Sequence, residues 1–267
     1  MMIKKYVLLI LLTWLIFNPS GSAPARQTVG MEDSSSSMTV RAVMDSVTNR
    51  FDLIRDYMVI VRITVRMPGF RMPQKRVDLA FKQPDKIKVE TTGFAVVPRT
   101  GLTMAPGEIF GNLAEPSIAG QDTLDGRVHW LITSPVHPDS LMFQPGRRGR
   151  PEPERPRVRL WIDSQHWVIC RMEAYADTTR FVTVNAEYTE VQDHLWLPAE
   201  TEFTFMFPEN LRAQTGRTTP RDMDPDMPGM ENFSPEQLAG STGYVHLEFT
   251  HYRVNTGLSD RFFEREQ

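Results

Sequence analysis

The stretch Tyr57-Met58-Val59-Ile60-Val61-Arg62-Ile63-Thr64-Val65-Arg66-Met67 decides the fold class of this chain. Apolar side chains from Tyr57 to Met67 occupy every second position, and polar side chains enter only at the positions between them. A period of two predicts a long β-strand with one apolar face and one mixed face. Met67-Pro68-Gly69 supplies the turn residues that end the strand.

The segment before this strand has a different period. Its apolar residues recur at spacings of mostly three and four, which predicts an amphipathic helix over residues 39–56: Val40, Val43, Met44, Val47, Phe51 and Ile54. Ser37 or Thr39 can cap the first turn of this helix. A helix that runs directly into a long strand is therefore the expected start of the domain.

Alternation resumes after the first strand and continues through most of the chain. Val77, Leu79 and Phe81 share one face, and the turn Gln83-Pro84-Asp85 separates them from a strand around residues 86–90. Further strands are predicted at residues 127–133, 157–163, 167–175, 181–190, 200–207 and 244–254, with a short tail element at 258–263. The sequence predicts about nine to eleven strands, mostly antiparallel, in an α+β domain over residues 39–267.

Four segments lack a period. Residues 26–38 form a polar, Ser-rich lead, and residues 144–156 carry repeated Pro and Arg. Residues 93–120 are rich in Gly, Pro and Met and are interpreted as a lid loop with a short helical piece at 108–113. Residues 208–240 are interpreted as a disordered excursion.

The N-terminus has the order of a secretory signal peptide. Lys4 and Lys5 precede an apolar run from Tyr6 to Phe17, and small residues follow it around Ala23 and Ala25. The run is shorter than the ~20 residues that a spanning helix needs, although a membrane anchor is the alternative. Residues 1–25 are thus predicted to be cleaved, and the chain is predicted to be periplasmic, with secretion as the second choice.

Composition and motifs exclude several classes of function. A net charge of −3 argues against a nucleic-acid partner, and the single Cys170 permits no internal disulfide. No phosphate-binding loop, nucleophile elbow or His-Glu-x-x-His motif is present. The sequence therefore predicts no enzyme activity, no catalytic residue, no metal and no cofactor.

Scattered polar residues do not change this interpretation. His246 and Glu248 share a strand face that His251 does not, so the three are expected to form a solvated surface and no metal site. Asp163 and His166 are typical of a hairpin turn. Cys170 is expected to be an inert core residue. The basic cluster Arg147, Arg148 and Arg150 is interpreted as a solvated loop, with a docking patch for an acidic partner or anionic headgroups as the alternative.

Apolar residues line one face of nearly every predicted strand, and one helix is a thin cover for so wide a sheet. The surplus apolar surface indicates either a site for an apolar ligand or an ordinary β core with well-packed loops. Periodicity alone leaves these two interpretations open.

Several stretches resemble one known superfamily. They are Tyr57–Met67 after its helix, Val77–Ile87, the hairpin of Val158–Asp163 with Trp167–Glu173, Leu195–Pro198 and Tyr252–Leu258. Together they resemble the LolA/LolB-like superfamily of periplasmic lipoprotein carriers and lipid-binding proteins, which includes sensor domains of the RseB type. The resemblance covers about residues 39–262.

This resemblance implies a curved, incomplete antiparallel barrel, covered by the N-terminal helix and lid loops, whose concave side holds acyl chains. The side chains expected to bind them are Val59, Val61, Ile63, Val77, Leu79, Phe81, Leu160, Ile162, Met172, Phe203 and Phe205. Gln83 stands where the carriers have an arginine in a gating turn, and glutamine lacks the guanidinium fork.

Two functions follow as expectations. The first is a carrier or binding protein for acyl chains of lipids or lipoproteins, acting toward the outer membrane with at most transient membrane contact. The alternative is an envelope sensor or regulatory module that binds another protein.

Overall fold

The structure is a computed structural model that describes residues 38–68, 70–91, 103–137, 156–192, 194–206 and 240–264. Residues 1–25, nearly all of the polar lead, most of the Pro/Arg loop and nearly all of the excursion at 208–240 lie outside the described residues. In the described part of the chain, no helix is long and apolar enough to span a membrane.

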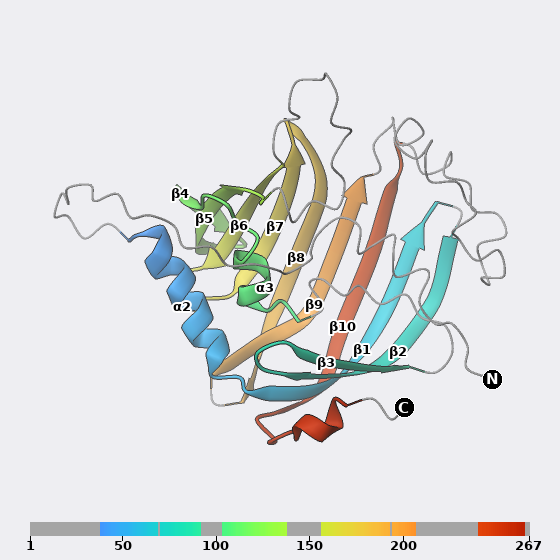
Figure 1. Cartoon of the computed structure of the whole chain (residues 1–267). Helices are drawn as coiled ribbons and strands as arrows, with labels where there is room; N and C mark the ends of the chain where they lie inside the picture. Colours follow the sequence, from blue (N-terminus) through green and yellow to red (C-terminus); the bar gives the residue numbers. More distant parts are fainter. Residues whose placement is uncertain are drawn as a thin grey trace, which may run out of the picture.

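One antiparallel sheet forms the body of the molecule. Its strands are β1 (Asp56–Met67), β2 (Phe70–Lys82), β3 (Lys86–Thr91), β4 (Ser117–Leu124), β5 (Arg127–Pro135), β6 (Arg157–Asp163), β7 (Ile169–Ala176), β8 (Thr179–Gln192), β9 (Leu195–Met206) and β10 (Thr242–Val254). Their order across the sheet is β3-β2-β1-β10-β9-β8-β7-β6-β5-β4. Figure 1 shows this sheet as a curve that does not close, with the helices α2 (Val40–Asp52) and α3 (Pro106–Phe110) on its inner side. The predicted α+β class and the curved, incomplete barrel are confirmed.

Helix α2 starts where the sequence predicted and ends earlier. The side chain of Thr39 accepts a hydrogen bond from the backbone N–H of Ala42, so Thr39 is the cap. Val43 and Val47 are buried on its inner face. The helix ends at Asp52 and not near Asp56, because the chain turns at Leu53 and Asp56 already pairs with Lys82 as the first residue of β1.

Three strands differ clearly from the prediction. β2 begins at Phe70 and not near Val77, because the residues just before Val77 are mostly polar and show no apolar period. β4 begins inside the segment 93–120, interpreted as a lid, and runs past its end; its residues are exposed or half-buried, so no apolar period marked it. As the outermost strand of the sheet, it can be polar on both faces. β9 begins at Leu195 and not at Glu200, since Pro198 is accommodated opposite Tyr188 at a register shift.

A single apolar face runs across the sheet and forms the core. On β1 it carries Val59, Val61 and Ile63, which are 0–3% exposed. Partners across the ladder continue it: Val61 lies opposite Val77 on β2 and Phe249 on β10, and Phe203 on β9 lies opposite Val245. The core is therefore one continuous cluster and not several separate ones.

The C-terminal segment is fastened to the junction between α2 and β1. The buried carboxylate of Asp56 accepts hydrogen bonds from the backbone N–H groups of Thr256, Gly257 and Leu258 and from the Thr256 hydroxyl, at 2.8–3.3 Å. The 3-10 helix η3 (Asp260–Phe262) follows, and Asp260 pairs with Lys82 at 2.6 Å. One carboxylate thus holds together two parts of the chain that are far apart in sequence.

Candidate functional site

The residues expected to bind acyl chains lie on the apolar face. Ten of them are buried members of the core cluster: Val59, Val61, Ile63, Val77, Leu79, Phe81, Leu160, Ile162, Met172 and Phe203. Phe205 is half-buried and packs against the same cluster. These residues lie on strands that are not all neighbours, and apolar residues of β8 and β10 connect them across the sheet. For example, Val184 of β8 lies opposite both Met172 of β7 and Phe203 of β9. The structure therefore brings all eleven residues to one surface.

This apolar surface extends beyond its cover at one edge. Ile87 and Val89 of the edge strand β3 lie opposite Phe81 and Leu79 and are 41% and 37% exposed. Leu53, at the end of α2, is also exposed. Residues of the core face that remain open to solvent are the ones a ligand would meet first.

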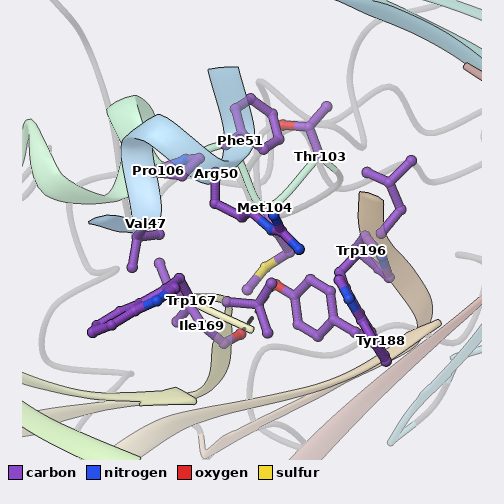
Figure 2. A pocket seen from close by; sticks show the side chains of 13 residues that line it. Val47, Arg50, Phe51, Thr103, Met104, Pro106, Trp167, Ile169, Tyr188 and Trp196 are labelled. Atoms are coloured by element: carbon purple, nitrogen blue, oxygen red, sulfur yellow. Dashed lines mark hydrogen bonds between the residues drawn. The ribbon is translucent and has the colours of Figure 1, made fainter. Parts of the chain in front are cut away.

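A small pocket lies where α2 and the segment before α3 meet the sheet (Figure 2). Its cavity volume is about 20 Å³, which is room for about one water molecule. Its lining is mostly aromatic and apolar, with Phe51, Met104, Trp167, Tyr188 and Trp196 around it. The Tyr188 hydroxyl donates to the carbonyl of Ile169 at 3.1 Å.

Two polar atoms of this pocket are buried without a hydrogen-bond partner among the described residues: Arg50 Nε and Thr103 Oγ1. Arg50 Nη2 donates to the carbonyl of His194 at 2.7 Å, so the guanidinium is held in place. A buried donor without a partner costs stability. The sequence does not indicate this pocket, because its residues come from segments that meet only in the folded chain.

Gln83, predicted to be a gating residue, lies in the turn between β2 and β3. Its side-chain amide donates to the carbonyl oxygens of Phe51 and Ile54 at 3.2 and 2.9 Å, and its backbone N–H donates to Arg55 O at 2.9 Å. The turn is thereby tied to the end of α2. Gating by Gln83 stays a prediction, whereas its contact with the helix end is part of the structure.

Replacing Gln83 by Ala is expected to lower the free energy of unfolding by about 1–2 kcal/mol, because the partly buried carbonyl oxygens of Phe51 and Ile54 lose their side-chain donor. Urea denaturation of the two proteins measures the difference. Asp85→Ala, an exposed change in the same turn, is the control and is expected to stay within about 0.5 kcal/mol of the parent. Equal stability of Gln83→Ala and Asp85→Ala would contradict the assigned contact.

Glu108 is the one titratable residue of α3. Burial raises its pKa to about 7, and its charge in turn helps to raise the pKa of the buried Tyr57. A buried carboxyl group lacks the water contacts that would stabilise its ionised form. The helix that lies over the sheet therefore carries a group that changes charge near neutral pH.

The scattered polar residues form separate contacts. His246 Nε2 lies 3.2 Å from Glu200, whereas Glu248 pairs with Arg62 at 2.8 Å. His251 is exposed, and the three do not converge, as predicted. Arg147, Arg148 and Arg150 lie outside the described residues.

Cys170 departs from its predicted environment. The register of β6 and β7 shifts there, so that Ile162 pairs with Ile169 and Trp161 with Arg171, and Cys170 has no partner across the ladder. The thiol is half-buried and lies beside Asp163. Burial, with the Asp163 charge, raises its pKa to about 11. The thiol is thus protonated at neutral pH, and it lies in a polar cluster, which corrects the expectation that Cys170 is a core residue.

No protein-family model matches this chain, and no curated protein matches it in sequence. Its fold is similar to that of a DUF1329 family protein from Desulfovibrio piger, with 12% identity, a TM-score of 0.50, and coverage of 84% of this chain and 97% of that one. A putative outer membrane lipoprotein-sorting protein domain from Vibrio parahaemolyticus has 9% identity and a TM-score of 0.49, covering 82% and 95%. A LolA superfamily protein from Nitrosomonas europaea has 13% identity and a TM-score of 0.45, covering 83% and 97%.

At 12% identity, the likeness to the DUF1329 family protein establishes a shared fold and no function.

Proposed function

We propose that this chain is a binding protein for acyl chains, of lipids or lipoproteins, and that its apolar sheet face is the binding surface. The observation that carries the proposal is the width of this face. It extends from β2 to β5 across eight neighbouring strands of the sheet, and α2 and α3 are the two helices that lie over it in the described part of the chain. Such a face gains binding free energy from area, since each methylene that leaves water contributes ~0.8 kcal/mol.

The small pocket beside Arg50 and Thr103 supports one orientation of the ligand, with its polar end in this pocket. Arg50 and Thr103 offer donors that lack partners among the described residues, at one end of an otherwise apolar surface. A carboxylate or phosphate at the end of an acyl chain would satisfy both donors. The acyl chain would enter at the open edge formed by Ile87 and Val89. Helix α2 and the segment before α3 would have to move apart to admit the polar end, since the pocket now has room for about one water molecule.

A carrier acting in the envelope fits this chemistry. The predicted signal peptide would deliver the chain to the periplasm, and a ligand held by area without covalent chemistry can be passed on. The proposed role is therefore transfer of acyl-bearing molecules toward the outer membrane, without catalysis.

Native mass spectrometry of the full chain, expressed with its leader and followed by organic extraction, tests the ligand class. We expect an added mass that extraction removes and that is recovered as acyl lipid or lipopeptide. A clean ligand-free mass, together with no uptake of a fluorescent fatty acid, would overturn acyl binding. A stable complex with an envelope protein would then favour the sensor or regulatory module.

Phe203→Asp is expected to abolish uptake of the fluorescent fatty acid, because it places a charge in the middle of the apolar face. Thr204→Asp is the matched control, since Thr204 is the next residue of β9 and is exposed on the other face. Circular dichroism checks the folding of both variants. Uptake by folded Phe203→Asp equal to that of Thr204→Asp would count against this face.

A second pair covers the case in which Phe203→Asp does not fold. Val89→Glu changes an exposed residue at the open edge, and Met206→Glu changes an exposed residue of β9, on the face away from Phe203. We expect weaker uptake for Val89→Glu alone, with both variants as stable as the parent.

A further inference from the structure

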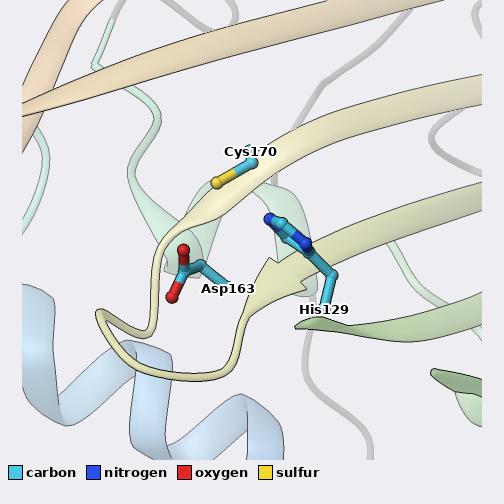
Figure 3. Close-up of side chains that lie close together, drawn as sticks. All are labelled: His129, Asp163 and Cys170. Carbon is cyan, nitrogen blue, oxygen red and sulfur yellow. The ribbon is translucent and has the colours of Figure 1, made fainter. Parts of the chain in front are cut away.

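Three side chains from neighbouring strands meet at one point of the structure (Figure 3). They are His129 of β5, Asp163 at the end of β6 and Cys170 of β7, and one ligand-type atom from each lies within 4.8 Å of the other two. His129 and Asp163 are opposite each other in the ladder and are 1% and 0% exposed. The register shift leaves Cys170 without a paired residue on β6, and a bulge of this kind can change the direction of its side chain.

His129 presents a free lone pair to this point. Its Nδ1 lies 2.9 Å from the carbonyl oxygen of Arg127, and a carbonyl can only accept, so Nδ1 carries the proton. Nε2 is then unprotonated in the neutral ring. A backbone carbonyl that fixes the tautomer in this way is the usual outer partner of a metal-binding imidazole.

Asp163 is likewise held by its surroundings. One oxygen, Oδ1, accepts the backbone N–H groups of Gln165 and His166 at 2.8 and 2.9 Å, which fixes the carboxylate. The other, Oδ2, is buried and accepts no hydrogen bond within the described ranges, although the Arg127 guanidinium lies 3.3 Å away. Asp163 Oδ2 thus forms an ion pair with Arg127, and a buried carboxylate oxygen that faces an exposed guanidinium in this way is a position that a metal cation can also occupy.

We propose that His129, Asp163 and Cys170 bind a zinc-type divalent cation, with a fourth coordination position left open. The set of one nitrogen, one oxygen and one sulfur suits Zn²⁺ and is wrong for Ca²⁺ or Mg²⁺, which take oxygen ligands. Tetrahedral zinc places neighbouring ligand atoms roughly 3.3–3.8 Å apart. The distances between the three ligand atoms therefore need to shorten by only about 1 Å. The site lies next to β4 and β5, the last two strands at this side of the sheet.

Arg127 competes with the cation for Asp163. Its side chain is 51% exposed, so it can swing into solvent when a metal arrives. Removing the guanidinium leaves the Asp163 charge uncompensated, which favours a bound cation. Arg127→Gln is thus expected to tighten metal binding, whereas loss of a ligand weakens it.

Titration of the full chain with Co²⁺, a spectroscopic substitute for Zn²⁺, tests the proposal. We expect one equivalent to bind with a thiolate-to-cobalt charge-transfer band in the near ultraviolet. Cys170→Ser should remove the band, and His129→Gln should weaken binding by about tenfold or more. His251→Gln, at an exposed histidine, is the control and should leave the titration unchanged.

A second measurement does not depend on the folding of variants. Cys170 is the single cysteine, so its modification by a small thiol reagent can be followed by mass in the unaltered protein. One equivalent of Zn²⁺ should slow this modification at least severalfold, and a chelator should restore it. Unchanged modification with Zn²⁺, or a cobalt spectrum without the thiolate band, would overturn the site.

Discussion

Replacing Asp56 by Ala is expected to lower the free energy of unfolding by about 3–5 kcal/mol, because a buried acceptor of four hydrogen bonds disappears. The donors left behind are the backbone groups of Thr256, Gly257 and Leu258 and the Thr256 hydroxyl. Each charge-assisted bond is individually worth more than a neutral one. Chemical denaturation of the parent and the variant measures the loss.

Asp56→Asn tests the charge while keeping the shape of the side chain. Its amide keeps one acceptor oxygen but turns an NH₂ group toward the remaining donors. We expect it to be almost as destabilising as Asp56→Ala. Asp52→Ala, at an exposed residue at the end of α2, is the control. Limited proteolysis adds a local test, because release of the segment after Val254 should expose it to cleavage. A loss below about 1 kcal/mol would show that these four bonds do not hold the segment.

Glu108→Gln is expected to stabilise the protein by about 2–3 kcal/mol at pH 8 and to leave its stability unchanged at pH 4. The folded chain holds the Glu108 proton up to a pKa of about 7, whereas the ordinary value is 4.5. Between these two values the folded state binds more protons than the unfolded state, so stability falls as the pH rises. Glutamine has no proton to release and so removes this fall.

Denaturation curves of the two proteins at several pH values from 4 to 8 measure the difference between them. All other groups titrate in both proteins and largely cancel. Glu115→Gln, at an exposed carboxylate after α3, is the control and should show no such pH-dependent gain. A gain for Glu108→Gln that is equal at pH 4 and pH 8 would contradict the burial of the charged group.

Strands with one buried face could be predicted from the sequence, and strands without one could not. β6 has the predicted bounds Arg157–Asp163, because Val158, Leu160 and Ile162 alternate along the core face, although Trp161 and Asp163 on the other face are buried as well. β4 forms the edge of the sheet and exposes much of both faces, so its sequence shows no period. The apolar face followed from the same alternation, which is why its proposed binding residues lie together.

The polar clusters depend on geometry that alternation does not encode. Arg50 and Thr103 line one pocket because the end of α2 and the segment before α3 meet over the sheet. His129, Asp163 and Cys170 meet because of register and a single irregular position in β7. A count of alternating residues gives Cys170 the wrong neighbours, since one unpaired residue changes which of the following side chains share a face.

The place of β10 has a consequence for how the chain acquires its structure. This strand lies between β1 and β9, so the hairpins β1–β3 and the meander β4–β9 are joined within the sheet only by a strand made after both of them. Until β10 arrives, each half has an unpaired edge and an incomplete core. Pairings of such long sequence separation form slowly. A growing chain would therefore stay unfolded, or hold two unfinished halves, until synthesis passes Val254.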